Sequence, residues 1–544
     1  MPSLSQLRKQ DASPALVLTI VCAGVILASL DVFIVNVALP TIARDLHVSS
    51  LGSLSWVLNA YAIVYASLLV LFGRLSEGRA RQNGFLIGVL VFTLGSAACG
   101  LSTSLTMLIV FRVIQAAGAA LLTPTSMSLI LATAPPEKRQ RSVRTWTALG
   151  GAAAAFGPVV GGLLVAASWR WIFFVNVPIG LAAAVIGWLR LPNVPGHPVK
   201  RPDALGAVLI TAAVGLLSLA LVQGNDWGWG SLRTVLALVA TVVLLAAFVF
   251  RLMRHHNPLI EPSLFRNRAF TGSSVAVFVF NIAFGSMLLS IVLWEQQVWG
   301  WSALRTGLAI APGPLVVPFF AFLLTGRLIA RWGPGRVIGL GGTVYSLGII
   351  WWIVRAGLHP DYVTMVLPGS LLTGAGVGLT LPTIMSTGTS TLPPQALATG
   401  PAAINMLRQV GVAVGVSILV AVIGTPHSGP DALHAFRAGW TVIAVFGVLT
   451  ALTAPLLLAR VGPARKPRTQ TVVTVNPAST TNTASTVGTV NNVGTVNNVG
   501  TSDTSDTART INTTSTTGAV STTGTAGAVE AMSTTHAVDA AGTE

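Results

Sequence analysis

The strongest constraint on the fold is that the apolar residues fall into long runs, separated by short stretches of Arg, Pro, Gly and Asp. Each run is about 18 to 25 residues long, which allows an α-helix to cross roughly 30 Å of hydrocarbon. Only 9% of the 544 residues are charged and 52% are hydrophobic, whereas soluble proteins carry about 25% charged residues. The chain is therefore predicted to be an all-α integral membrane protein.

We expect fourteen transmembrane helices in the lipid bilayer, one for each apolar run. Their approximate ranges are 16–39, 54–73, 84–101, 105–131, 145–167, 171–190, 204–222, 232–253, 269–293, 303–326, 335–356, 362–385, 399–424 and 437–458.

The net charge of +16 raises the question of a nucleic-acid partner, and the positions of the basic residues decide it. If the N-terminal segment, 1–15, is cytoplasmic, most Arg and Lys lie on the cytoplasmic side, as the positive-inside rule expects. We therefore predict a multi-pass protein of the cell membrane with both termini cytoplasmic and no nucleic-acid binding. The cytoplasmic side receives, among others, Arg8, Lys9, Arg74, Arg79, Arg81, Lys138, Arg139, Arg141, Arg144, Arg327, Arg331 and Arg336, and the other side receives Arg44, Arg170, Arg233, Arg305, Arg355 and Arg437.

The composition changes abruptly after about Leu458 to Thr, Val, Asn, Ser, Gly and Ala, with the repeat GTVNNVGTVNNVG starting at Gly488. Such a segment has too little apolar surface to form a core, so 459–544 is predicted to be a disordered cytoplasmic tail. The alternative is that its Thr, Val and Asn repeats pair as strands with a partner.

Charged residues inside the apolar runs are informative, because each costs about 2.5 to 3.5 kcal/mol near the bilayer centre. Asp31 is the acid deep inside a run, and it suits reversible protonation, although a structural ion pair would also explain it. Arg112 keeps its proton, so we expect it to hold a carboxylate or a carbonyl. Gln115 follows one turn later and gives Arg112 a polar face that turns to other helices.

Two further runs carry patterns typical of a transport path. Asn405, Arg408 and Gln409 form a polar face that is predicted to line a cavity, while Gly411 and Gly415 allow close packing elsewhere on the same helix. The run 145–167 contains a second set of packing residues, in which the proline removes a backbone donor and the glycines let a neighbour approach. This set consists of Gly157, Pro158, Gly161 and Gly162.

Glu295 lies at the end of the run 269–293, among Trp294, Trp299 and Trp301. The tryptophans are expected to anchor the helix at the membrane interface. For Glu295 two interpretations remain open: a solvated residue at the interface, or a site for a substrate cation or a proton.

Two loops of similar sequence indicate an internal repeat. Gly73–Arg81 follows the second predicted helix, and Gly326–Gly333 follows the tenth. They predict two six-helix bundles, 16–190 and 269–458, with 204–253 as an inserted helical pair.

This arrangement resembles the major facilitator superfamily, in which the substrate cavity lies between the two halves near the midplane. Several motifs are similar to those of its fourteen-helix drug:proton antiporters. They are Leu30-Asp31 through Asn36 to Pro40, Gly157-Pro158 with Gly161-Gly162, Trp169-Arg170-Trp171-Ile172-Phe173 with Asn176-Val177-Pro178-Ile179-Gly180, and Asn405 with Arg408-Gln409.

The resemblance implies roles for these residues. Asp31 and Arg112 would couple transport to protons, and Gly157-Pro158 would be the antiporter motif. The loop Gly73, Arg74, Glu77 and Arg81 would form a cytoplasmic latch, although the family usually has Asp at position 77, Arg at 78 and Gly at 80. The substrate cavity is expected to include Asn36, Gln115, Glu295, Asn405, Arg408 and Gln409.

The function most consistent with these observations is export of amphipathic or cationic drug-like compounds in exchange for protons, by a monomer without cofactor or metal. The alternative is a proton symporter that imports a small nutrient. Cys22 and Cys99 lie in apolar runs and are expected to be core residues. No catalytic motif such as HExxH or GxSxG occurs, which argues against an enzyme, and no ring of like charges indicates a channel.

Overall fold

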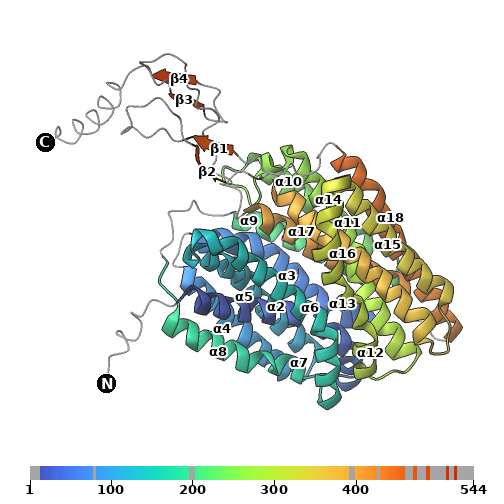
Figure 1. The fold of residues 1–544 in the computed structure, drawn as a ribbon. Helices are drawn as coiled ribbons and strands as arrows, with labels where there is room; N and C mark the ends of the chain where they lie inside the picture. The colour runs from blue at the N-terminus through green and yellow to red at the C-terminus, as the bar shows by residue number, and fades with distance from the viewer. Residues whose placement is uncertain are drawn as a thin grey trace, which may run out of the picture. The chain divides into compact units, whose positions relative to one another are not determined.

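The computed structural model describes residues 13–77, 81–194, 203–390, 392, 399–424 and 429–459, and four short strands further on. It divides into two units, Met1–Pro463 and Ala464–Glu544, which are described separately. The first unit is a helical bundle (Figure 1).

The helices of the first unit follow the order of the predicted runs. The N-terminal half contains α2 (Pro14–Asp45), α3 (Leu51–Glu77), α4 (Arg81–Gly100), α5 (Leu105–Thr133), α6 (Pro136–Ala167), α7 (Trp171–Phe174) and α8 (Asn176–Arg190). The inserted pair is α9 (Ala204–Trp227) and α10 (Leu232–Arg254). The C-terminal half contains η1 (Pro262–Arg266), α11 (Arg268–Leu293), η2 (Trp294–Val298), α12 (Ala303–Ile310), α13 (Pro312–Phe319), η3 (Phe320–Leu324), α14 (Thr325–Trp332), α15 (Pro334–Arg355), η4 (Tyr362–Val366), α16 (Leu367–Ser390), α17 (Thr399–Ile423) and α18 (Gly429–Leu458).

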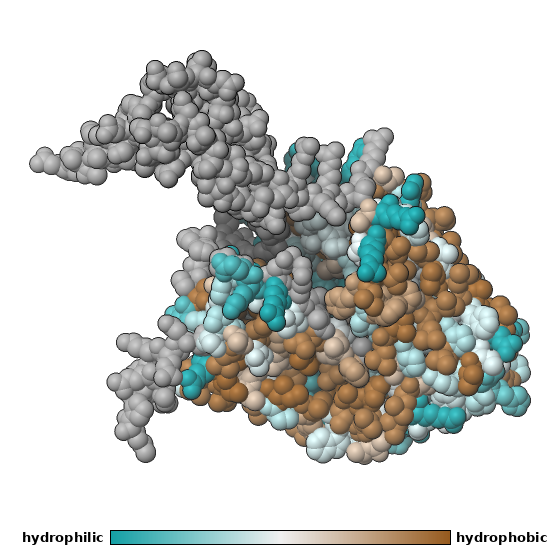
Figure 2. Space-filling model, viewed as in Figure 1, coloured by the Kyte–Doolittle hydropathy of each residue, from teal (hydrophilic) through white to brown (hydrophobic). Residues whose placement is uncertain are grey.

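Thirteen helical spans among the described residues are long and apolar enough to cross a membrane, which confirms the all-α membrane class. The remaining predicted span, 145–167, lies within α6, in which the described part Phe156–Ala167 is an apolar helix. α6 begins before that span, and its first turns carry Glu137 and Lys138. Hydrophobic side chains cover most of the visible face of the bundle (Figure 2), as expected of a surface in contact with lipid.

The tenth predicted span is not one regular α-helix. It consists of α12, α13, the π-helical segment η3 and α14, because Pro312, Pro314 and Pro318 each lack a backbone donor and interrupt the regular hydrogen bonding. α11 likewise ends in a π-helical segment, η2, which extends the span to Val298.

Each long helix reverses the direction of the one before, so alternate loops lie at the same end of the bundle. We call the end that holds the loops after α2, α4, α6, α11 and α15 the distal face. Contacts between these loops support the grouping: Arg170 pairs with Asp45 at 2.7 Å, and the Trp299 indole donates to the Gly357 carbonyl at 2.9 Å. The opposite end, where α2 begins and α18 ends, is the proximal face.

Within the N-terminal half, α2 packs against α6 and α5 packs against α3 and α4; within the C-terminal half, α15 packs against α16 and α18, and α11 against α17. Two seams join the halves, α3 with α17 and α6 with α12. α9 packs against both α3 and α17, whereas α10 packs against α9. A pairing of Arg251 with the buried Asp203, at 2.7 Å, ties the two inserted helices together.

The second unit is described only in four strands. β1 (Gln470–Val473) pairs antiparallel with β2 (Thr486–Val490), and β3 (Thr510–Thr513) pairs antiparallel with β4 (Val520–Thr523). The disordered tail expected from composition stays a prediction, because most of the segment 459–544, like most of the segment 1–15, lies outside the described residues.

Candidate functional site

The buried acid predicted from the sequence lies in a compact polar cluster. Asp31 on α2 and Arg112 and Gln115 on α5 are at most 1% exposed. Arg112 Nη1 pairs with Asp31 Oδ2 at 2.5 Å and donates to Gln115 Oε1 at 2.8 Å. Gln115 Nε2 donates to Asp31 Oδ1 at 2.8 Å. Both carboxylate oxygens therefore have a donor, and the three side chains form a closed ring of polar contacts.

Arg112 is held on its other sides as well. Its Nε donates to the Val57 carbonyl on α3 at 3.1 Å, and its guanidinium lies 4.1 Å from the centre of the Tyr61 ring. This confirms the expectation that Arg112 holds a carboxylate and a carbonyl. In a buried environment such contacts offset the loss of hydration that an ion pair suffers. A change in the charge of Asp31 would therefore change the electrostatic attraction that holds the Arg112 guanidinium in place.

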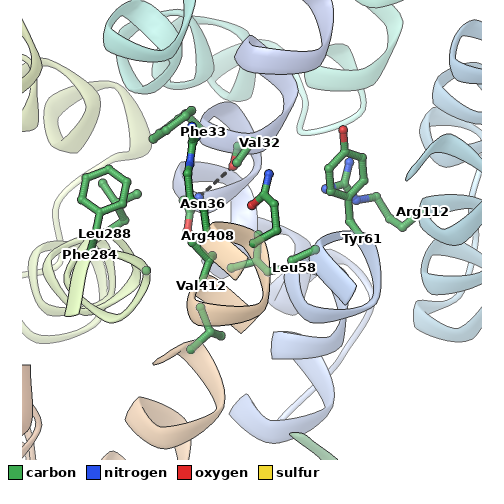
Figure 3. Close-up of a pocket in the computed structure, with 14 residues that line it drawn as sticks. Val32, Phe33, Asn36, Leu58, Tyr61, Arg112, Phe284, Leu288, Arg408 and Val412 are labelled. Carbon is green, nitrogen blue, oxygen red and sulfur yellow. Dashed lines mark hydrogen bonds between the residues drawn. The ribbon is translucent and has the colours of Figure 1, made fainter. Parts of the chain in front are cut away.

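A pocket lies between the two halves and adjoins this cluster (Figure 3). Arg112 and Tyr61 stand on one side and Phe284 and Leu288 on the opposite side, with Arg408 between them. Its walls come from α2, α3 and α5 of the N-terminal half and from α11 and α17 of the C-terminal half. The lining residues are Val32, Phe33, Asn36, Leu58, Tyr61, Ala62, Arg112, Phe284, Gly285, Leu288, Arg408, Gln409, Val412 and Val416.

Arg408 is the second cation of the pocket. Within the described part of the chain it makes no hydrogen bond or ion pair, and the titratable side chain whose charge acts on it is that of Tyr65. The pocket wall contains no carboxylate. A guanidinium without a partner among the described residues, in a wall that holds no carboxylate, favours a bound group that accepts hydrogen bonds.

The predicted cavity residues separate into two groups. Asn36, Arg408 and Gln409 line the pocket, and the Asn36 amide donates to the Val32 carbonyl at 3.0 Å. Gln115 lies behind the wall in the acid cluster, and Asn405 lies beside the Tyr65 hydroxyl. Gly411 and Gly415 turn to α11, where an added Cβ would contact the backbone of Phe278 and Ile282.

Of the two interpretations left open for Glu295, the structure excludes the solvated interface residue. Its exposed fraction is 0%, and it is not part of the pocket wall. The tryptophans around it are also buried instead of facing lipid: Trp294 packs on Trp299 with ring centres 6.0 Å apart, and Trp299 packs on Trp301 at 5.0 Å. The sequence did not reveal this burial because the covering residues come from distant segments.

The glycines of α6 contact two different partners. Gly157 and Gly161 face α2 of the same half, where a Cβ at Gly157 would lie 2.7 Å from Phe33 Cβ. Gly162 faces the other half, where a Cβ would lie 2.7 Å from the Ala303 carbonyl oxygen. Pro158 lies within the continuous helix α6. In this state the contact between halves therefore depends on Gly162 more than on Gly157.

The predicted cytoplasmic latch makes contacts at the proximal face. Arg74 lies 3.6 Å from Glu261, which precedes α11 of the other half, and Arg81 Nη1 donates to the Ser128 carbonyl at 3.2 Å. Gly73 packs near Pro124. The side chain of Glu77 lies outside the described residues. Arg74 thus connects the two halves, whereas Arg81 connects α4 to α5.

Sequence reasoning missed the aromatic part of the site. Tyr61 and Tyr65, one turn apart on α3, stack with ring centres 5.9 Å apart, and Phe33 and Phe284 meet from opposite halves at 6.3 Å. The one signal for them was the i, i+4 spacing of the two tyrosines.

Comparison with known proteins identifies the class to which this fold and site belong. Residues 21–416 match the Major Facilitator Superfamily, so the chain belongs to that family. Among solved structures, a peptide transporter POT in complex with sulfate superposes with a TM-score of 0.60 over 84% of this chain and 99% of its own, at 15% identity. The POT family transporter PepTSo superposes with a TM-score of 0.58 over 81% of this chain and 97% of its own, at 18% identity. Both show the shared fold. The chain is a multi-pass membrane transporter and not an enzyme.

Two relatives within the family are similar in sequence to this chain. The methylenomycin A resistance protein of Bacillus subtilis is 33% identical over 75% of this chain and 87% of its own length. The tetracenomycin C resistance and export protein of Streptomyces glaucescens is 35% identical over 60% of this chain. That second match spans 61% of the relative's own length.

Proposed function

We propose that this protein exports amphipathic drug-like compounds across the cell membrane in exchange for protons. The observation that carries the proposal is the position of Arg112, which lines the pocket and also pairs with the buried Asp31. A proton on Asp31 would remove the negative charge that holds the guanidinium, so binding in the pocket and protonation would influence each other through one side chain. The names of the two relatives, which refer to antibiotic resistance and export, support this direction of transport.

The proposal includes the orientation of the chain. The excess of basic residues in the loops of the proximal face supports a cytoplasmic position of that face, with the distal face outside the cell. In the state described here the halves meet tightly at the distal face through Gly162, which corresponds to a conformation closed to the outside. Alternating access would then exchange this contact for one at the proximal face.

The pocket wall narrows the substrate class. The expectation from sequence included cationic compounds, whereas the wall carries Arg408 and no acid. We propose that compounds with an aromatic or aliphatic body and a carbonyl, phenolate or carboxylate acceptor bind best, because the acceptor can pair with Arg408 and the body can pack on Phe284 and Leu288.

The test is transport in reconstituted vesicles with an imposed proton gradient. A panel of dyes and antibiotics, with and without acceptor groups, is measured for movement against its own gradient, with and without an uncoupler. We expect uncoupler-sensitive transport of the compounds in the direction opposite to that of the proton. Transport in the same direction as the proton would support the nutrient symporter instead. Transport at the same rate with and without the uncoupler would contradict both functions.

Arg408→Gln tests the substrate class within the same assay. We expect a loss of affinity of about 10-fold or more for acceptor-bearing compounds, because a charge-assisted hydrogen bond contributes about 1.5 to 3 kcal/mol. Arg233→Gln is the matched control, because Arg233 is an exposed arginine on α10. Equal losses for compounds with and without acceptors would contradict a role of Arg408 in recognition.

A further inference from the structure

Glu295, like Asp31, is a carboxyl group that is buried within a transmembrane span. It lies in η2, at the distal end of the α11 span, and its exposed fraction is 0%. Neither carboxyl oxygen has a hydrogen-bond partner in the described part of the chain. The Thr306 hydroxyl on α12 approaches the carboxyl group, but it too makes no hydrogen bond.

The charged and titratable groups around Glu295 do not neutralise it. Arg305 on α12 and Tyr362 on η4 are the groups whose charges act on it. The Arg305 guanidinium lies 4.1 Å from the centre of the Trp301 ring and makes no ion pair with Glu295. On α18, which also packs against η2, Arg437 donates to the Ala356 carbonyl at 3.0 Å.

A carboxylate ion in this position would be buried without a partner among the described residues, which is strongly unfavourable. The closed arrangement is therefore compatible with the protonated, neutral acid. Asp31 differs in this respect, because the Arg112 guanidinium and the Gln115 amide each donate to its carboxylate.

Glu295 lies inside the contact that closes the distal face. Its neighbour Gln296 donates from Nε2 to the Val37 carbonyl on α2 of the other half at 2.9 Å. The next helix, α12, begins at Ala303, against which Gly162 of α6 packs. The polypeptide from Glu295 to Ala303 therefore joins the two halves at this end, and we call it the distal gate.

We propose that Glu295 is a proton-binding site of the distal gate, neutral while the gate is closed and ionised when the gate opens to outside water. A proton taken from outside would then favour closure, which is the direction that proton-driven export requires after the substrate has left. This inference rests on the proposed function, and it adds to the Asp31 cluster a second carboxyl group with a different task.

The coupling between proton release and gate opening determines how strongly pH changes the fraction of open molecules. If opening releases one proton from Glu295, the ratio of open to closed molecules rises by up to about tenfold for each pH unit. Glu295→Gln keeps the size of the side chain and is always neutral, so it is expected to keep the gate closed at alkaline pH. Glu295→Asp retains the acid and is expected to retain opening at alkaline pH.

The experiment measures the gate directly, without substrate. Spin labels on cysteines at Thr103 and His359, exposed positions in distal loops of the two halves, report the width of the distal face between pH 5 and pH 9. Cys22 and Cys99 are buried, so the introduced cysteines are the ones expected to label. We expect the long-distance population to grow with pH in the parent protein and to be lost in Glu295→Gln.

Asp226→Asn is the matched control, because Asp226 is an exposed acid near the same face; it is expected to behave like the parent. The inference is overturned if Glu295→Gln opens with pH as the parent does, or if the parent shows no pH-dependent opening. Either failure is distinct from failure of the proposed function, which would appear as absence of proton-coupled transport in vesicles whatever the gate does.

Discussion

Asp31 and Glu295 are both carboxyl groups with no exposed surface, yet their surroundings are opposite. Asp31 accepts hydrogen bonds from Arg112 and Gln115, whereas the oxygens of Glu295 have no partner among the described residues. The first site stabilises a negative charge beside the pocket, and the second excludes one from the contact between the halves. Burial alone therefore does not define the role of a carboxyl group in this protein. Its role depends on the hydrogen-bond donors that surround it.

The comparison is tested most strongly by Asp31→Asn. The amide keeps the side-chain size but cannot be charged, so we expect gradient-driven export in vesicles to fall to the level of empty vesicles. Binding of substrate and the amount of inserted protein should be retained. Full-rate, uncoupler-sensitive export by this variant, with Asp226→Asn as the control for loss of an acid elsewhere, would contradict a coupling role.

The next effect concerns the free energy of unfolding. Arg112→Gln leaves the Asp31 carboxylate buried without its cation, which is expected to cost about 3 to 5 kcal/mol. The double variant with Asp31→Asn should recover most of that loss, because neither charge remains. Thermal unfolding in detergent measures both. Equal stability of the single and the double variant would show that the two side chains do not interact energetically.

Glu295→Gln should behave differently in the same measurement. Because no donor is lost, we expect the melting temperature at acid pH to stay within about 2 °C of that of the parent, a shift of the size that about 1 kcal/mol produces in a domain of 150 to 250 residues. At alkaline pH the variant should be the more stable protein, since the parent must then ionise a buried acid or open. A loss as large as that of Arg112→Gln would show that Glu295 has a stabilising partner.

The smallest expected effect concerns Tyr61, whose ring contacts Arg112 in the Asp31 cluster. Tyr61→Leu removes the ring that lies 4.1 Å from the Arg112 guanidinium, and the lost cation–π contact is expected to cost about 0.5 to 2 kcal/mol. Tyr61→Phe is the control and should be close to neutral, because the Tyr61 hydroxyl has no hydrogen-bond partner in the described residues. Equal effects of the two substitutions would assign the contribution to the hydroxyl group.

Much of the fold could be predicted because the bilayer imposes length and composition on each span. Asp31 and Arg112 were found from sequence for the same reason: a charge inside an apolar run is costly and therefore informative. The burial of Glu295 could not be decided from sequence, because this residue follows an apolar run that ends at Leu293 and the π-helical turn that continues the span has no clear sequence signal. Its burial depends on Thr306, Tyr362 and α18, which are distant in sequence.

The glycines of α6 also show what sequence alone cannot predict. Their spacing indicates close approach of a neighbouring helix, and the structure has such approaches at Gly157, Gly161 and Gly162. Spacing does not say which neighbour it is. That Gly162 meets the other half, whereas Gly157 meets α2, depends on how the two bundles are placed against each other.

The inserted helix α9 has a consequence for how compounds reach the pocket. It packs on α3 and α17 together and so lies across one of the two seams between the halves. A compound dissolved in the membrane leaflet would meet α9, with α10 behind it, on that side. A compound in the lipid therefore meets a covered seam on this flank, and the two flanks of the protein differ toward the bilayer, because the main contacts of the inserted pair are with α3 and α17 and not with α6 and α12.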